Sequence, residues 1–280
     1  MQGIISALVT PFTPDGEIDW EAFHLYLDWQ LSFQPDIILA LGSTGEAHLL
    51  SDQEQMEVLR FVVKKSRHKG VKVMAGAGCA ATNTTIEKAK CFEQLGADAL
   101  LIVTPYYVKP SAEGLFAHFT NVASATKVPI VLYNVPSRTG VDLEHKTVLT
   151  LFEHENIIGI KEASSDVNRI GQLRKYTDKY IYSGDDVSCS EALDLGADGV
   201  ISVISNYMPK SMFNMYKTDQ RDQWRKKYKG WLEEIGSYGP NPVVIKALLS
   251  EAGYMTPSVR LPLVRLSDAA HQRLILSITQ

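Results

Sequence analysis

The chain contains eight short segments in which nearly every residue is apolar. They occupy residues 4–10, 36–42, 71–77, 99–104, 129–135, 157–161, 180–184 and 199–204. Near-continuous apolar runs of this length are typical of parallel strands that are covered on both faces. Eight such strands, each followed by a returning helix, predict a (β/α)8 TIM barrel. A doubly wound open sheet is the alternative, but it usually has fewer strands and a nucleotide-binding loop.

Helix signals separate these segments. The stretch "SDQE" at Ser51–Glu54 predicts a capping box, and Thr84–Glu87 and Ser188–Glu191 repeat the pattern. Similar sequences, "LGADALLIVT" and "LGADGVISVI", begin 100 residues apart at Leu95 and Leu195. This similarity reflects either repetition of βα units or chance similarity of a common turn. Both explanations fit a regular alternation of strands and helices. A further apolar stripe at helical spacing comprises Leu115, Phe119 and Val122.

Beyond about residue 205 the sequence shows helical patterns but no further strand pattern. Segments such as "WRKKYKGWLEEIG" and "NPVVIKALLSEAG" predict helices that follow the last barrel helix. We therefore expect a catalytic barrel over residues 1–222 and a C-terminal helical appendage over residues 223–280.

Charge and composition exclude several classes of function. The formal net charge of −4 does not favour nucleic acid or an anionic membrane as a partner. The apolar runs are far too short to span a bilayer, and the first residues predict a strand instead of a signal peptide. The three cysteines are scattered and form no CxxC motif, so we expect a reducing, cytoplasmic setting.

Lys161 ends the apolar run "IIGIK". Active sites of barrels of this type lie at the carboxyl ends of the strands, and a desolvated lysine is more often a neutral amine that attacks a carbonyl to form a Schiff base. The structural alternative is that Lys161 emerges at the strand end and pairs with Glu162. Because strand side chains alternate between faces, that pairing is awkward.

Other polar residues follow neighbouring strands. Tyr133 is suited to relaying protons to an imine, and Arg138 to holding a carboxylate; a core tyrosine and a surface arginine are the structural alternatives. The glycine-rich stretch "GSTGE" at Gly42–Glu46 is suited to binding a carboxylate or phosphate, or is only a turn.

We expect no metal and no cofactor. The seven histidines show neither an HxH nor an HExxH spacing. Asp185 and Asp186 are suited to binding a cation, but a helix N-terminus explains them equally well.

Several of these motifs together resemble a known family. "ALVTPF" from Ala7, "GSTGE", "TPYY", "YNVPSRTG" and "GIKEAS" are similar to the pyruvate-dependent class I aldolase superfamily, which includes dihydrodipicolinate synthases and N-acetylneuraminate lyases. The pair "YNVPSRTG" and "GIKEAS" resembles the synthase branch. Ser43 departs from the usual synthase motif "GTTGE" but retains a hydroxyl.

The resemblance implies a role for each matching residue. Lys161 would form the imine with pyruvate, and Tyr133, Thr44 and Tyr107 would relay protons. Ser43 and Thr44 would hold the pyruvate carboxylate. The remaining substrate-binding positions would be Arg138, for the carboxylate of L-aspartate 4-semialdehyde, and Gly184 and Ile201, through backbone groups.

The resemblance also implies an assembly and a regulatory property. Tyr107 would enter the site of a neighbouring subunit, which implies a homo-oligomer, a tetramer built as a dimer of dimers. Feedback inhibition by lysine would be weak or absent, because the positions that match the inhibitory cleft are unsuited to it: His48 is bulky, and Ala80 and Thr84 offer no strong ligand. The other two matching positions are Asp52 and Gln55.

Three functions remain open on this basis. The first is the condensation of pyruvate with L-aspartate 4-semialdehyde. The second is cleavage of N-acetylneuraminate or a keto-deoxy sugar acid by the same imine chemistry. The third is a catalytically silent barrel that senses pyruvate-like acids.

Overall fold

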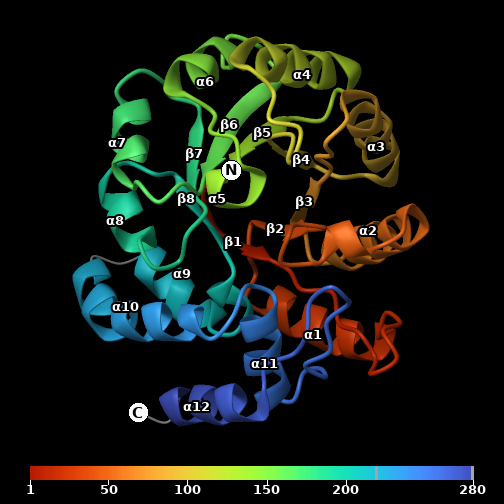
Figure 1. The fold of residues 1–280 in the computed structure, drawn as a ribbon, viewed down its shortest axis with the longest axis vertical. Helices are drawn as coiled ribbons and strands as arrows, with labels where there is room; N and C mark the ends of the chain where they lie inside the picture. The colour runs from red at the N-terminus through yellow and green to blue at the C-terminus, as the bar shows by residue number, and fades with distance from the viewer. Residues whose placement is uncertain (218–219, 279–280) are drawn as a thin grey trace.

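All eight predicted strands form, and they close into a parallel barrel in which β1 pairs with both β2 and β8 (Figure 1). The computed structural model describes residues 1–217 and 220–278. The strands are β1 Gly3–Ala7, β2 Ile37–Ala40, β3 Lys72–Gly76, β4 Ala99–Val103, β5 Ile130–Asn134, β6 Ile157–Glu162, β7 Tyr180–Ser183 and β8 Gly199–Ser202. The predicted TIM barrel is therefore confirmed.

Helices surround the barrel as an outer ring (Figure 1). They are α1 Trp20–Ser32, α2 Asp52–Arg67, α3 Thr82–Leu95, α4 Ala112–Ala125, α6 His145–Leu151, α7 Asn168–Arg174, α8 Cys189–Asp194 and α9 Pro209–Lys217. Three single-turn helices, η1 Ala47–Leu49, α5 Pro136–Thr139 and η2 Ile204–Asn206, occupy loops after strands. The predicted stripe on α4 is buried, as an amphipathic helix against a barrel requires.

One of the three predicted capping boxes forms. Ser51 caps α2, and its side chain and that of Glu54 bond reciprocally to the backbone. The box at Thr84–Glu87 is wrong, because α3 already begins at Thr82 and Thr84 lies within its first turn. Ser188 does precede α8 but makes no side-chain cap. Its hydroxyl donates instead to Asp185, so the predicted box is wrong there as well.

The strands divide the apolar core into two layers. Outward side chains such as Ile38, Leu100 and Ile160 pack beneath the helices. Alternate residues fill the barrel interior, including Ile5, Leu39, Met74, Leu101, Val131, Tyr133, Tyr182 and Ile201. Burial on both faces explains why the strands read as continuous apolar runs.

The C-terminal region consists of α10 Arg221–Ser237, α11 Val243–Glu251 and α12 Asp268–Ile278. The expected boundary between residues 222 and 223 lies in the first turn of α10. The segment after α11 returns to the barrel, where Thr256 donates a hydrogen bond to the carbonyl of Phe12.

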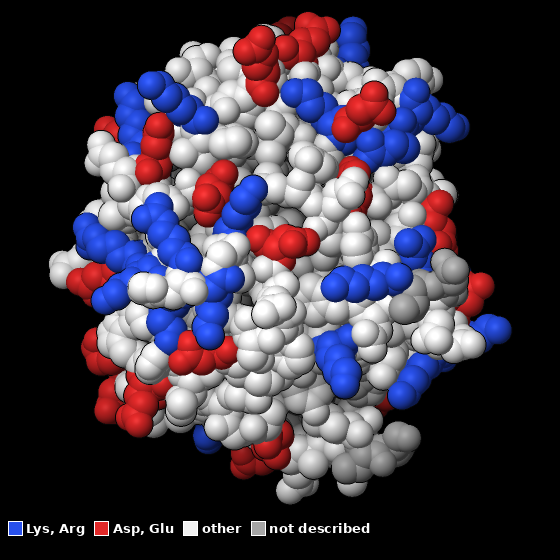
Figure 2. All heavy atoms as spheres, turned by 180° about the vertical axis from the view of Figure 1, so that it is seen from behind, with Lys and Arg blue, Asp and Glu red and all other residues white. Residues whose placement is uncertain are grey.

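The surface carries charges of both signs. On the face shown in Figure 2, basic and acidic side chains are interspersed, and neither sign covers it continuously. Among the described helices, none is long and apolar enough to cross a membrane.

Candidate active site

Lys161 lies on the inner face of β6, one residue before the strand ends. It is paired in register with Tyr133 on β5 and Tyr182 on β7, and only 5% of its surface is exposed. Its Nζ lies 4.4 Å from the centroid of the Tyr133 ring. The structure therefore brings the predicted nucleophile and the predicted relay tyrosine together.

Glu162 lies on the opposite face of β6, as strand alternation requires. Its carboxylate accepts hydrogen bonds from Arg169, and no ion pair joins it to Lys161 among the described contacts. The structural alternative for Lys161, pairing with Glu162, is therefore wrong. Lys161 remains a buried amine beside an aromatic ring.

Gly184 leaves room for the Lys161 side chain. A Cβ atom at this position would lie 2.7 Å from Cε of Lys161 and 2.6 Å from Cβ of Ala163. Such contacts are too short, so a side chain here would displace the lysine. Ile201 on β8 is buried in the same interior cluster as Tyr133.

The loop after β2 carries Ser43 and Thr44. The amides of Gly45 and Glu46 donate to the carbonyls of Gly42 and Ser43 at 3.1 Å each, which makes the loop a tight backbone turn. Thr44 is buried and Ser43 is half-buried. Both hydroxyls therefore belong to one closed turn, which restricts their positions.

A cavity of about 550 Å³ lies over this end of the barrel. Ser43, Tyr133 and Arg138 are among the side chains that line it. Arg138 lies on α5, and its Nη2 donates to the carbonyl of Asn241 at 3.4 Å, so the C-terminal region helps to hold it. Gly184 lies beside a second, smaller cavity of about 170 Å³.

Tyr107 is not brought to this cavity within the chain. Its side chain is 90% exposed, and its backbone φ of +72° is unusual for a residue with a side chain. Tyr106 lines the cavity instead and stacks on His48, with ring centroids 5.4 Å apart. A role for Tyr106 was not predicted from the sequence; the available signal was the pair "YY", of which one tyrosine lines the cavity.

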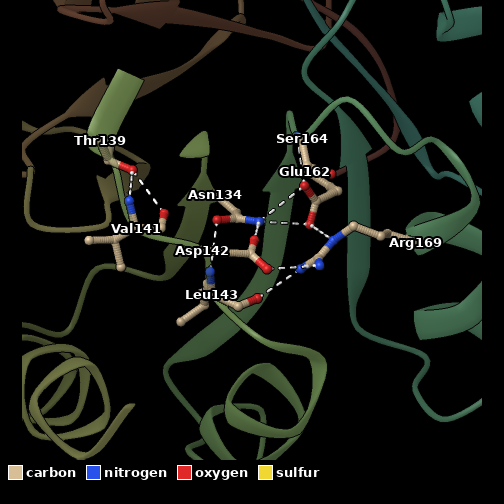
Figure 3. A network of polar contacts seen from close by, with 8 residues as sticks. All are labelled: Asn134, Thr139, Val141, Asp142, Leu143, Glu162, Ser164 and Arg169. Atoms are coloured by element: carbon tan, nitrogen blue, oxygen red, sulfur yellow. Dashed lines mark hydrogen bonds and ion pairs between the residues drawn. The ribbon is translucent and has the colours of Figure 1, made fainter. Parts of the chain in front are cut away.

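Asn134 and Glu162, the residues that follow Tyr133 and Lys161, join a polar network with Asp142 and Arg169 (Figure 3). The amide of Asn134 donates to both carboxylate oxygens of Glu162 at 3.2 Å and to Asp142 at 2.8 Å. Arg169 pairs with Glu162 at 3.2 Å and with Asp142 at 3.0 Å. Each strand thus carries an inward reactive residue followed by an outward network residue. No sequence motif predicted this network.

The side chains of Asp185 and Asp186 accept hydrogen bonds from backbone amides. Asp185 accepts from the amide of Ser188 at 2.8 Å, and Asp186 accepts from the amides of Val203 and Ile204 at the start of η2. Burial raises the pKa of the Asp186 carboxyl. Over residues 1–217 and 220–278, no group of three or more histidine, cysteine, aspartate or glutamate side chains is arranged to hold a metal ion.

The positions expected to form a lysine-binding cleft are already engaged. Gln55 donates to the carbonyls of Ala47 and Leu50. Lys88 lines the cavity near His48 and pairs with Asp52 at 3.7 Å. Burial lowers the pKa of His48, with Lys88 and Arg138 adding to the effect. This side of the cavity therefore already carries a cation.

Comparison with known proteins identifies the family. Residues 1–280 match the model described as the dihydrodipicolinate synthetase family. The 4-hydroxy-tetrahydrodipicolinate synthase of Xanthomonas campestris pv. campestris is 42% identical over 283 residues, covering 97% of this chain and 91% of that protein. The synthase of Coxiella burnetii is 37% identical, with coverage of 99% and 97%.

Solved structures show the same likeness. A chloride-inhibited dihydrodipicolinate synthase from Acinetobacter baumannii, complexed with pyruvate, gives a TM-score of 0.95 at 38% identity, covering 99% of this chain and 98% of that one. The dihydrodipicolinate synthase of Thermotoga maritima gives a TM-score of 0.95 at 32% identity, with coverage of 100% and 98%. The chain belongs to the dihydrodipicolinate synthetase family.

Proposed function

We propose that this protein condenses pyruvate with L-aspartate 4-semialdehyde through an imine on Lys161. The observation that carries the proposal is the buried Lys161 amine, 4.4 Å from the ring centroid of Tyr133 at the carboxyl end of the strands. The names of the relatives, and the pyruvate complex of the Acinetobacter baumannii protein, support the substrate class.

The reaction follows from an amine in this position. The Lys161 nitrogen attacks C2 of pyruvate, and loss of water gives the imine. Loss of a C3 proton yields an enamine, whose C3 attacks the aldehyde carbon of the semialdehyde. The amine of the semialdehyde then attacks C2 and releases Lys161, so the balanced products are a cyclic hydroxy acid and one water. No metal or other cofactor takes part.

The surrounding residues divide the remaining tasks. Tyr133 passes protons to and from the imine nitrogen and the new hydroxyl. Ser43 and Thr44 hold the pyruvate carboxylate. Arg138 on the cavity wall holds the carboxylate of the semialdehyde with its planar fork. Backbone groups of Gly184 and Ile201 complete the pocket.

The relay requires a second subunit. Tyr107 is exposed at the surface of this chain, so we propose that it enters a partner's site, with Tyr133 and Thr44, in a tetramer built as a dimer of dimers. A dihydrodipicolinate synthase among the similar structures is described as the first monomeric variant.

Two further properties belong to the proposal. Lysine inhibits the enzyme weakly or not at all, because Lys88 and the bulky His48 occupy the side of the cavity where a second ammonium would have to bind. The enzyme works in the cytoplasm, in keeping with three free thiols at Cys79, Cys91 and Cys189.

A substrate panel tests the function. We expect turnover with pyruvate and L-aspartate 4-semialdehyde, little cleavage of N-acetylneuraminate, and similar rates with and without lysine. Arg138→Ala should raise the KM of the semialdehyde more than that of pyruvate. Equal activity on N-acetylneuraminate would contradict the substrate assignment, and loss of turnover at micromolar lysine would contradict the regulatory one.

A further inference from the structure

Glu46 and Lys246 form an ion pair that is completely buried. Nζ of Lys246 lies 2.5 Å from Oε1 of Glu46, and both side chains are 0% exposed. Burying two charges is costly, and such a pair persists only with close geometry and further hydrogen bonds. The two residues are far apart in the sequence, and one of them belongs to the "GSTGE" loop.

The neighbours of the pair provide those further contacts. Lys246 donates to the carbonyl of Ser258 at 2.9 Å and lies 4.0 Å from the ring centroid of Phe12. The second oxygen of Glu46 accepts the backbone amide of Arg260 at 2.9 Å. Helix α11 and the segment after it therefore enclose the Glu46 carboxylate.

The guanidinium of Arg260 adds contacts with the residues that follow the loop and with the connection between β1 and α1. It donates to the carbonyl of Leu49 at 3.1 Å and to that of Gly16 at 2.8 Å, and it pairs with Glu54. Glu54 is the N3 residue of the capping box of α2, the helix that follows the loop. The C-terminal segment thus fixes the loop and the start of the next helix together.

The backbone of Glu46 adopts a conformation that needs such support. Its φ is +53°, in the left-handed region that residues with a side chain rarely occupy. Its amide donates to the carbonyl of Ser43 at 3.1 Å, which closes the turn that carries both hydroxyls. The position of the Glu46 side chain is thereby coupled to the positions of Ser43 and Thr44.

We propose that Lys246 and Arg260 are positioning residues that hold the Ser43–Thr44 turn in the conformation that binds the carboxylate of pyruvate. Lys246 acts through its ion pair with Glu46, and the Arg260 side chain acts through its contacts with Leu49 and Glu54, which follow the turn. The inference rests on the proposed function, since it assigns the turn to pyruvate. It gives the C-terminal region a part in catalysis, although that region lies outside the barrel strands. A role in stability alone is the competing explanation, and the two make different predictions for the kinetic constants.

The decisive experiment measures separate KM values in variants of the pair. In Lys246→Met we expect the KM of pyruvate to rise by about tenfold or more, because a misplaced binding group costs this much or more. The KM of the semialdehyde should change less than about twofold. In Lys246→Arg, which keeps a cation, the KM of pyruvate should largely recover. In Glu46→Gln/Lys246→Met, which leaves no unpaired charge, it should recover in part.

Two further variants provide the controls. Arg174→Met breaks an ion pair with Asp198, which lies before β8 at the opposite end of the barrel. It should lower Tm without changing either KM. If Lys246→Met does not fold, Arg260→Gln keeps the buried pair and the backbone hydrogen bond to Glu46 but loses the side-chain contacts with Leu49 and Glu54, and it should raise the KM of pyruvate alone.

The outcomes separate the two proposals. If borohydride fails to trap pyruvate on the wild-type enzyme, the proposed function is wrong. If wild type is trapped but a folded Lys246→Met or Arg260→Gln keeps the wild-type KM for pyruvate, the positioning role is wrong and the pair serves only stability. Equal changes in both KM values would also overturn it.

Discussion

Two polar networks flank the candidate site, and they are built differently. The network of Asn134, Asp142, Glu162 and Arg169 joins residues 7 to 28 positions apart (Figure 3). It is partly open to water, since the Asp142 side chain is 42% exposed. The Glu46–Lys246 pair joins distant parts of the chain and is fully buried. The first includes the residues that follow Tyr133 and Lys161, and the second includes Glu46 of the loop that carries Ser43 and Thr44.

Because the two networks contact different parts of the candidate site, they are expected to support different functions. We expect a network next to the proposed nucleophile and relay tyrosine to affect the chemical step. We expect a network attached to the proposed pyruvate-binding turn to affect the binding of pyruvate. The free-energy cost of breaking each network depends on its burial, because an unpaired charge costs far more in the interior than at the surface.

The largest effect is expected from breaking the buried pair. Lys246→Met should lower the free energy of unfolding by about 3–5 kcal/mol, because Glu46 is left as an uncompensated buried charge. Urea unfolding measures this loss. Adding Glu46→Gln should restore part of it; a double variant less stable than Lys246→Met would show that the pair does not behave as a coupled buried pair.

A smaller effect is expected from the network behind β5 and β6. Glu162→Gln replaces an oxygen that accepts from Ser164 or Arg169 with a donor, so stability should fall by about 1–3 kcal/mol. Since Glu162 follows Lys161 directly, kcat should fall more than the KM of pyruvate rises. A change in the KM of pyruvate alone would erase the distinction between the two networks.

A change in pH tests the ion pair between Glu54 and Arg260. The hydrogen bond from Arg260 lowers the pKa of Glu54 from 4.5 to about 2. The ionised carboxylate therefore stabilises the folded state fully above about pH 4.5, and this contribution is lost as the pH falls towards 2. Glu54→Gln should be less stable than wild type at neutral pH.

That difference should shrink as the pH falls from about 4.5 towards 2, as followed by urea unfolding at a series of pH values. A difference that stays constant over this range would show that the Glu54 carboxylate is not the group responsible.

The smallest effect is expected at Asp142. Asp142→Asn removes a partly exposed charge but keeps an oxygen that can accept from Asn134. The free energy of unfolding should change by less than about 1 kcal/mol, and kcat should stay near the wild-type value. A loss as large as that of Glu162→Gln would mean that exposure does not govern the strength of these contacts.

Much of the fold follows from local patterns in the sequence. The eight apolar runs predict the eight strands, and alternation correctly separates Lys161 from Glu162. The pairing of Lys161 with Tyr133 follows from the order of the strands. These features depend on the alternation of side chains along each strand and on the order of the strands in the barrel. Both can be inferred from short stretches of sequence.

Other features depend on contacts that no short stretch contains. The Glu46–Lys246 pair forms only when α11 packs against the loop after β2. The sequence around either residue therefore does not predict its partner. The choice between Tyr106 and Tyr107 depends on a left-handed backbone at Tyr107. The failed box at Thr84 reflects a helix that starts two residues earlier, at a site where the sequence allows several starts.

The most direct test of the central claim is reduction with borohydride in the presence of pyruvate, followed by mass spectrometry of the digested protein. We predict one covalent adduct on the peptide that contains Lys161, and none in a folded Lys161→Ala variant. An adduct that persists in Lys161→Ala, or that maps to Lys246 or Lys88 in the wild type, would contradict the assignment of Lys161 as the nucleophile.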